Sequence, residues 1–371
     1  MTTGFFWDER CFWHAGGNYV FTLPVGGLVQ PQVTGGLPEN PETKRRLKNL
    51  MDVTGLTNDL AAQTAAPAEW EDLLRVHPAS YLSEFKRLSD AGGGELGRRT
   101  PFAAGGFEIA TLSAGLSIAA VEAVLTGDLD NAYALSRPPG HHCLPDFPNG
   151  FCLLANIAIA IETAKARHGL GKVAVLDWDV HHGNGTEAIY YDRDDVLTIS
   201  IHQEGNYPTD TGAITDRGRG AGEGYNMNVP LPAGAGHTAY LAVMDEIVRP
   251  ALDAFQPDMI IVACGFDASA CDPLARMLAT ADTFQQMTLS IKDAAADLCD
   301  GKLVLVHEGG YSEMYVPFCG HATLEALSGS AITAPDPMAE TFAIRQPSAR
   351  FDAFLREIVR DAADVLRTPS T

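Results

Sequence analysis

The chain has 371 residues, of which 46% are hydrophobic, so it is long enough to bury a large core. It carries 47 acidic and 26 basic residues, which gives a formal net charge of -21. Such a surface repels phosphate backbones, which argues against a nucleic-acid-binding protein, and it attracts cationic substrates or basic protein tails.

The cysteines indicate a reducing compartment. There are seven, an odd number, scattered along the chain without a CxxC pair: Cys11, Cys143, Cys152, Cys264, Cys271, Cys299 and Cys319. The N-terminal stretch lacks the features of a signal peptide, and no uninterrupted apolar run reaches the length of a bilayer span. We therefore expect a soluble cytoplasmic protein without a membrane partner.

Helical and strand-like patterns alternate along most of the chain. Residues 4–36 are read as a short strand and loops. Helices are predicted at 41–51, 69–75, 80–88, 107–125, 156–167, 238–255, 283–298 and 352–366. Strands are predicted at 132–135, from residue 173, and at 196–202, 225–230, 259–264 and 303–307. This alternation predicts an α/β fold with a parallel sheet covered on both faces, in a single domain spanning 1–371.

The stretch VAVLDWDVHHGNG at residues 173–185 carries the strongest chemical signal. Its apolar start is typical of a buried parallel strand. Asp177, Asp179 and His181 lie two residues apart, so they share one face at the carboxyl end of the sheet, where α/β folds place their sites. A metal site fits this pattern, although a polar strand end that caps a helix would look similar.

Three more loops place polar groups after predicted strands: RPPGHH with His141 and His142, CGFDASACDP with Asp267, and HEGGY with Tyr311. A metal held by Asp179, His181 and Asp267 would keep one open position, which is the catalytic arrangement. The ligand types suit zinc and also Fe(II). Asp177 and His182 are then candidates for orienting the ligands.

The tandem histidines and the tyrosine each allow two interpretations. His141 and His142 are either surface residues or a general-base and general-acid pair beside a metal-bound water. Tyr311 either packs after a turn or donates a hydrogen bond to an oxyanion.

Taken together, the motifs resemble the histone deacetylase family. They are RPPGHH at 137–142, GFC at 150–152, DWDVHHGNGT at 177–186, GFDA at 265–268 and EGGY at 308–311. The resemblance spans about residues 42–328, and HGNG makes the chain similar to class II members and to bacterial histone deacetylase-like amidohydrolases. It implies the arginase/deacetylase fold, a central eight-stranded parallel sheet flanked by helices, with the site at the carboxyl ends of the strands.

The resemblance also implies roles for individual residues. One catalytic Zn²⁺ would be held by Asp179, His181 and Asp267. The catalytic residues would be His141, His142, Asp177, Asn184 and Tyr311, with Asp177 pairing His141, Asn184 pairing His142, and Tyr311 donating to the transition state. One or two K⁺ ions are implied, the first at Asp177, Asp179, His181, Ser200 and Ile201, the second at Tyr190, Arg193, Val196 and Tyr225. The acyl-lysine tunnel would involve Gly150, Phe151, Tyr207, Leu274 and Gly310.

The implied reaction is hydrolysis of an amide, which removes acetyl or related acyl groups from acyl-lysine or similar acylated amines. Acetylpolyamine hydrolysis is the nearest alternative, but Leu274 stands where a polyamine-selective relative carries a glutamate. An arginase-like ureohydrolase would want a carboxylate where Ser269 stands. A catalytically idle metal-binding scaffold for acylated proteins is the non-enzymatic alternative. The rim acid is assigned to Glu95 or Asp90, and a homo-oligomer is expected by resemblance to bacterial relatives.

Overall fold

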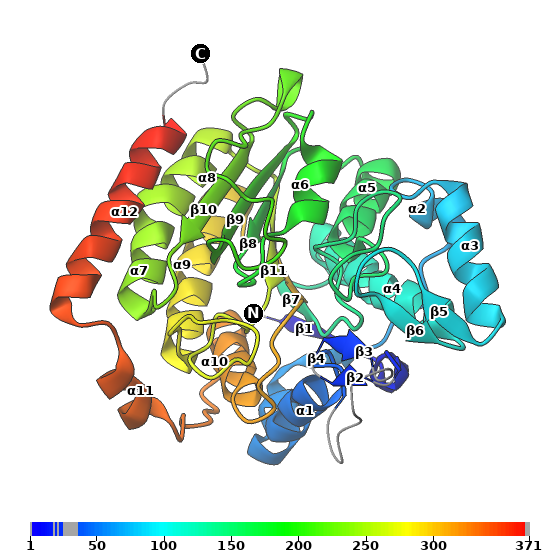
Figure 1. Cartoon of the computed structure of the whole chain (residues 1–371), viewed down its shortest axis with the longest axis horizontal. Helices are drawn as coiled ribbons and strands as arrows, with labels where there is room; N and C mark the ends of the chain where they lie inside the picture. The colour runs from blue at the N-terminus through cyan, green and yellow to red at the C-terminus, as the bar shows by residue number, and fades with distance from the viewer. Residues whose placement is uncertain (1, 18, 21, 25–35, 368–371) are drawn as a thin grey trace.

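The centre of the protein is one sheet of eight parallel strands. The structure, a computed structural model, describes every residue except 1, 18, 21, 25–35 and 368–371, so part of the segment 4–36 lies outside the described residues (Figure 1). The strand order is β10-β9-β8-β11-β12-β7-β1-β4. The strands are β1 (Thr3–Phe6), β4 (Ala61–Gln63), β7 (Asn131–Ala134), β8 (Val173–Asp177), β9 (Val196–Gln203), β10 (Asn226–Leu231), β11 (Met259–Cys264) and β12 (Leu303–His307). The predicted eight-stranded parallel sheet is confirmed.

The middle strands are apolar at nearly every position because helices cover both faces of the sheet. β8 reads VAVLD, β11 reads MIIVAC and β12 reads LVLVH, and every residue in these three strands is buried. The register pairs Val262 of β11 with Leu176 on one side and Leu305 on the other. β-Branched and apolar side chains thus fill the space between sheet and helices.

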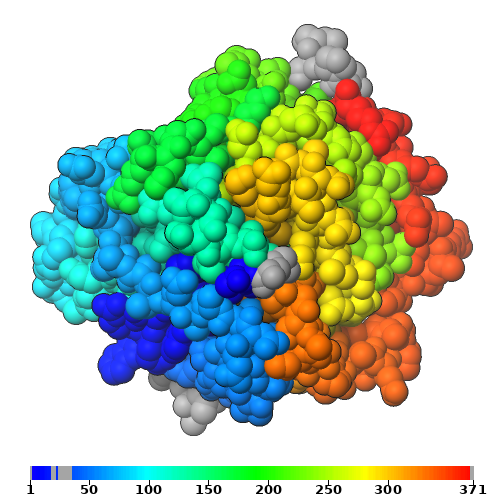
Figure 2. Space-filling view, turned by 180° about the vertical axis from the view of Figure 1, so that it is seen from behind, coloured from blue at the N-terminus to red at the C-terminus, as the bar shows by residue number. Residues whose placement is uncertain are grey.

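Two layers of helices flank the sheet, and Figure 1 shows α2 to α6 on one side and α7 to α10 with α12 on the other. The helices are α1 (Glu42–Thr54), α2 (Trp70–Leu73), α3 (Ala79–Asp90), α4 (Gly106–Leu125), α5 (Asn156–His168), α6 (Asn184–Tyr190), α7 (His237–Val243), α8 (Arg249–Phe255), α9 (Ala281–Cys299), α10 (Val316–Ser328), α11 (Ala339–Arg345) and α12 (Ala349–Arg367). In Figure 2, seen from behind, the blue α1 segment lies against the orange α10 segment, and the two helices are in contact. Two helices that are more than 260 residues apart in sequence are therefore neighbours in space.

Smaller elements complete the fold. Two hairpins pair β2 (Tyr19–Val20) with β3 (Leu23–Pro24) and β5 (Gly93–Glu95) with β6 (Pro101–Ala103). Short 3₁₀ turns occur at η1 (Glu9–Trp13), η2 (Leu56–Asp59) and η3 (Gly220–Gly222). The predicted helix 238–255 is interrupted by the π-helical turn η4 (Met244–Val248), because Pro250 lacks the N–H that would continue the α-helical ladder.

Helix α10 was not predicted from the sequence. It contains Pro317 and Gly320 and is buried on almost all sides, so it shows no amphipathic period. Its one start signal is Pro317 in the first turn, where a missing N–H costs nothing.

Helix α4 corrects one sequence-based expectation. By length and composition this 20-residue helix is apolar enough to cross a membrane, although no such run was expected. However, 67% of its most apolar window is buried inside the protein, where α4 packs on α5, β1 and β7. Its apolar character is therefore explained by its place in the core.

Candidate active site

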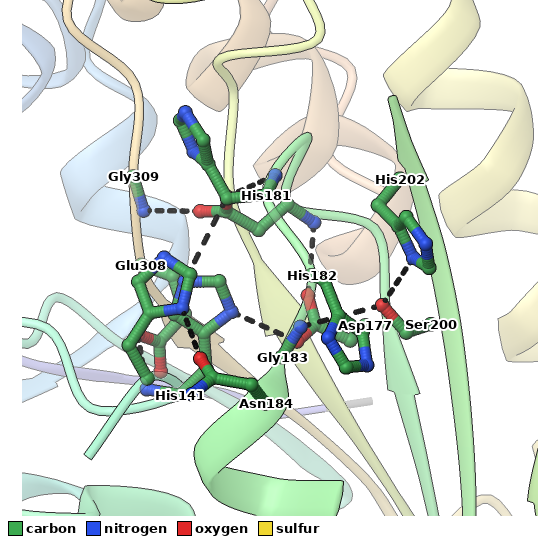
Figure 3. A network of polar contacts seen from close by, with 12 residues as sticks. His141, Asp177, His181, His182, Gly183, Asn184, Ser200, His202, Glu308 and Gly309 are labelled. Carbon is green, nitrogen blue, oxygen red and sulfur yellow. Dashed lines mark hydrogen bonds and ion pairs between the residues drawn. The ribbon is translucent and has the colours of Figure 1, made fainter. Parts of the chain in front are cut away.

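The loops that carry the chemical signal leave four adjacent strands of the sheet, in the order β8-β11-β12-β7. His141 and His142 follow β7, Asp179 and His181 follow β8, and Asp267 follows β11. The EGGY segment follows β12. Because parallel strands end at the same edge, residues 170 positions apart in sequence meet in one polar cluster, part of which Figure 3 shows.

Asp179, His181 and Asp267 form a buried group suited to a metal ion. One ligand atom from each lies within 4.8 Å of the others, and His181 Nδ1 is 3.0 Å from both Asp179 Oδ1 and Asp267 Oδ2. Backbone N–H groups fix both carboxylates: Gly309 donates to Asp179 Oδ2 at 2.8 Å, and Val180 donates to Asp267 Oδ1 at 2.8 Å. The three residues predicted as metal ligands are thus brought together.

The electrostatics of this group also fit a cation. Burial, followed by the negative charge of Asp179, raises the pKa of Asp267 to about 6. Two carboxylates this close need a positive partner to stay ionised. Two carboxylate oxygens and one imidazole nitrogen are a donor set that a divalent metal ion accepts.

The glycines of EGGY make room for these carboxylates. A Cβ at Gly309 would lie 2.2 Å from Asp267 Oδ2 and 2.6 Å from Asp179 Oδ2, which no side chain tolerates. The next residue, Gly310, has a φ of 121°, which favours glycine. It is not among the residues that line the cavity described below. Leaving room for the two carboxylates of the metal group is therefore a role of this motif that was not predicted from the sequence.

The two histidines of RPPGHH are paired as expected. His141 Nδ1 is 2.9 Å from Asp177 Oδ2, and His142 Nδ1 is 2.8 Å from Asn184 Oδ1. Both imidazoles are 3% exposed, and their ring centroids are 4.0 Å apart. Figure 3 shows His141, Asp177 and Asn184 gathered from the loop after β7, the end of β8 and the start of α6.

The two imidazoles differ in charge. Burial lowers the pKa of His142, and the positive charge of His141 lowers it further. Burial would also lower the pKa of His141, but the carboxylates of Asp179 and Asp177 outweigh it and raise that pKa well above the ordinary value. One imidazole is thus held neutral and the other charged, which is the separation that acid–base catalysis requires.

A cavity of about 370 Å³ leads to this cluster. Phe151 and Tyr207, the predicted aromatic walls, both line it, together with Leu274 and Gly150. The lining also includes His142, His181 and Tyr311, so the acid–base and metal groups face the cavity. The Tyr207 hydroxyl does not project free into the cavity, because it donates to Asn149 Oδ1.

The assignment of the rim acid to Glu95 or Asp90 stays a prediction. Asp90 pairs with Lys86, and Glu95 accepts a hydrogen bond from the Thr100 N–H at 3.3 Å. Neither is among the described residues that line the cavity.

Of the residues predicted for the first potassium ion, Asp177, Asp179 and His181 belong to the polar cluster, and Ser200 and Ile201 lie in β9. Ser200 accepts from the Gly183 N–H at 3.4 Å, and it lines a small polar hollow with Asp177 and Glu187. Ile201 is buried in β9, where it pairs with Val229 of the neighbouring strand.

The second set predicted for potassium is also close in space. The Arg193 N–H donates to the Tyr190 carbonyl at 3.0 Å, its guanidinium pairs with Asp195, and the Thr198 N–H donates to the Tyr225 carbonyl. Val196, the first residue of β9, is buried and pairs with Val173 of β8. Both potassium assignments stay predictions.

Two acidic residues that hold the site in place were missed. Glu308 accepts from the N–H groups of Gly140 at 2.7 Å and His141 at 3.0 Å, which fixes the histidine loop. Asp272 accepts from the N–H groups of Leu274 at 2.8 Å and Tyr311 at 2.7 Å. Both residues follow strands, β12 and β11, within motifs already singled out. This position is the signal from which they could have been found in the sequence.

Replacing Asp272 with alanine is expected to destabilise the fold, because one buried and one partly buried N–H group would lose their acceptor. The loss should be about 2–4 kcal/mol in the free energy of unfolding, since each unsatisfied group costs about 1–3 kcal/mol. Denaturant unfolding measures it. Asp272→Asn keeps one acceptor oxygen and should fall between wild type and Asp272→Ala; equal stability of all three proteins would contradict this role.

Comparison with known proteins agrees with the motifs. The family profile described as "Histone deacetylase domain" matches residues 37–327. A histone deacetylase-like amidohydrolase of Pseudomonas aeruginosa is 59% identical over 361 residues, which cover 97% of this chain and 95% of the relative. A probable deacetylase of Archaeoglobus fulgidus is 39% identical over 308 residues, covering 81% of this chain and 85% of the relative.

A solved structure agrees as well. The crystal structure of the HDA15 HD domain superposes with a TM-score of 0.80 at 30% identity, covering 100% of this chain and 99% of that one. The chain therefore belongs to the histone deacetylase family, whose members are deacetylases and related amidohydrolases.

Proposed function

We propose that this protein is a zinc-dependent amidohydrolase that removes acetyl or related acyl groups from acyl-lysine or a similar acylated amine. The observation that carries the proposal is the meeting of three groups at the floor of one cavity. These are the metal group of Asp179, His181 and Asp267, the neutral imidazole of His142, and the hydroxyl-bearing Tyr311.

Asp179, His181 and Asp267 would hold the ion, and their donor set fits Zn²⁺. When bound, Zn²⁺ supplies a Lewis acid that polarises the acyl carbonyl and makes a water molecule more acidic. The backbone donors Gly309 and Val180 keep the two carboxylates in orientation.

His142 is the general base in this proposal. The Asn184 Oδ1 atom can only accept a hydrogen bond, so His142 Nδ1 carries the hydrogen and Nε2 is left with a free lone pair. That lone pair takes a proton from the attacking water. His141, held in its charged form by Asp177, keeps positive charge beside the reacting amide, and a histidine returns the proton to the leaving amine.

Tyr311 stabilises the oxyanion by donating its phenolic hydrogen. Burial, followed by the negative charge of Asp267, raises the pKa of Tyr311 well above its ordinary value, so the hydroxyl keeps its proton. Phe151 and Tyr207 line the cavity and exclude water around the aliphatic part of the substrate.

The lining of the cavity favours acyl-lysine over acetylated polyamines. Leu274 lines the wall, and none of the described residues that line the cavity is an aspartate or glutamate. A polyamine would carry a second cation along the cavity without a carboxylate to meet it.

The proposal is tested by turnover of two substrate classes. The zinc-loaded protein should hydrolyse an acetyl-lysine peptide with a higher kcat/KM than acetylated putrescine or spermidine. The reverse order would favour the acetylpolyamine alternative. Bound zinc without turnover of any acylated amine would instead favour the metal-binding scaffold.

Metal removal gives a separate prediction. Dialysis against a chelator should abolish turnover and lower the melting temperature, and Zn²⁺ should restore both, because an ion that binds only the folded state stabilises it. At a hundredfold excess over Kd the shift is expected to be about 5 °C. Elemental analysis should find zinc in the wild type and little in Asp267→Ala. An unchanged melting temperature with full activity after complete metal removal would overturn zinc dependence.

The proposal extends to a cytoplasmic homo-oligomer with one or two structural K⁺ ions. Ile344 on α11 and Phe354 on α12 support an interface between copies, because these apolar side chains are 86% and 50% exposed. Size-exclusion chromatography at working concentration should give a species larger than the monomer, and a monomer alone would refute this part.

A further inference from the structure

The mouth of the substrate cavity is positively charged, although the protein as a whole carries a net charge of -21. Arg99 and Arg276 both line the cavity, and both side chains are exposed. No aspartate or glutamate is among the described residues that line it. The local charge at the entrance is therefore opposite to that of the surface.

Arg99 is fixed to the aromatic wall by its own backbone. Its carbonyl accepts from the Phe151 N–H at 2.9 Å, and the Arg98 carbonyl accepts from the Gly150 N–H at 3.0 Å. Arg99 also holds a left-handed φ of 58°, which is unfavourable for a side-chain-bearing residue. Its guanidinium carbon lies 5.2 Å from the centroid of the Tyr207 ring, so the charge is positioned beside the wall of the cavity.

Arg276 is anchored at the entrance in a similar way. Its N–H donates to Gln203 Oε1 at 2.7 Å, and its carbonyl accepts from the Gly234 N–H at 2.7 Å. Among the described residues, the guanidinium donates to the backbone carbonyls of Pro273 and Ala275, and both bonds come from the same terminal nitrogen. Three of its five N–H donors thus remain for a ligand.

Neither arginine has a carboxylate partner among the described residues. Several exposed arginines elsewhere on the surface pair with a carboxylate, as Arg219 does with Asp192 and Arg249 with Asp253. In a chain with so large an excess of acid, two unpaired guanidinium groups beside one cavity attract an anion to that place. Screening by salt limits this attraction to about 8 Å at physiological ionic strength, so it acts on a ligand in the mouth.

The position of the two arginines at the mouth indicates which part of the substrate lies near them. His142 and Tyr311 are buried, at 3% and 8% exposure, whereas the two arginines are exposed, so the reacting amide sits deep and the far end of the amine component points outward. Given the proposed function, we infer that this amine component carries a carboxylate, which Arg99 and Arg276 bind at the mouth. The carboxylate comes either from acidic residues that flank an acyl-lysine or from the acid group of a free acylated amino acid.

The test compares substrates that differ only in that charge. One pair is an acetyl-lysine peptide flanked by Asp and the same peptide flanked by Asn. The other pair is 6-acetamidohexanoate and its neutral carboxamide. Each is assayed with the wild type, Arg99→Gln, Arg276→Gln and the double variant, and Arg356→Gln on the exposed face of α12 is the matched control.

The wild type should favour the charged member of at least one pair in kcat/KM, by about three- to fivefold for each arginine. The glutamine variants should lose this preference, so that their ratio of kcat/KM for the charged and the neutral member of a pair falls toward one. Higher salt should also reduce the preference of the wild type for the charged member. The control Arg356→Gln should keep this preference. The pair with the larger ratio identifies the source of the carboxylate.

Two results would overturn the inference: equal turnover of charged and neutral members by the wild type, or a preference that survives in the double variant. If no acylated amine is hydrolysed, the proposed function fails separately. Calorimetric binding of the same pairs then decides the inference, because a cationic mouth binds the charged members more tightly whether or not they react.

Discussion

His142→Ala should reduce kcat by about 10²–10⁴-fold, the range contributed by a positioned general base. His142 is the neutral imidazole of the pair, and its free Nε2 faces the cavity that also exposes His181 and Tyr311. Alanine leaves no group at that place to take the proton from water. Steady-state turnover on an acetyl-lysine peptide measures the loss.

The control for this variant is His168→Ala. His168 lies at the surface, where it contacts Glu122, and its loss should leave turnover unchanged. Zinc content and melting temperature of His142→Ala should stay near those of the wild type, since His142 contacts none of the three metal ligands by hydrogen bond. Near-normal kcat in a folded, zinc-loaded His142→Ala would remove the base from the mechanism.

Tyr311→Phe should reduce kcat by about 10²–10³-fold with little change in KM, which is the loss expected when one oxyanion donor is removed. The phenylalanine ring keeps the packing of the original, which lies 5.9 Å from the Phe151 ring and under the Lys44 ammonium at 5.8 Å. Only the donor is lost. Turnover together with thermal unfolding separates this loss from a loss of structure.

Tyr240→Phe is the matched control, because Tyr240 is also buried but its hydroxyl has no hydrogen-bond partner among the described residues. Its activity should equal that of the wild type. If both variants turn over substrate equally well, the hydroxyl of Tyr311 has no part in catalysis.

The sheet and the metal group could be predicted because their signals are local. The strands β8, β11 and β12 are largely apolar runs, and each ends within three residues of a residue of the site. Strand order was not needed to expect convergence, since all parallel strands finish at one edge. For the same reason, the distances within Asp179, His181 and Asp267 agree with what the motif indicated.

The supporting groups could not be predicted because their partners are remote backbone atoms. Glu308 and Asp272 are single acidic residues in the sequence, and nothing in their neighbourhood shows that they accept from the distant N–H groups of Gly140 and Tyr311. The same is true of Arg137 in RPPGHH, which is 1% exposed and donates to Glu39 Oε1 at 2.9 Å. Such contacts depend on loops packed across the whole sheet.

The arginines at the mouth show a different limit. The net charge led to the expectation of cationic substrates, but a sum over the chain says nothing of where unpaired charges remain. Arg99 and Arg276 determine the local charge at the cavity, because no aspartate or glutamate is among the described residues that line it. Specificity at a site depends on these few groups within a Debye length.

The site residues lie in loops that follow four neighbouring central strands, and this position affects how the enzyme loses activity when it unfolds. β8, β11, β12 and β7 are the most enclosed strands of the sheet, with two strands on either side. Fraying of the outer strand β4 or undocking of the terminal helix α12 would leave the reacting groups in register. Catalysis should therefore persist through partial opening at the periphery and vanish only with cooperative melting of the centre, so that residual turnover reports on the global rather than the local unfolding equilibrium.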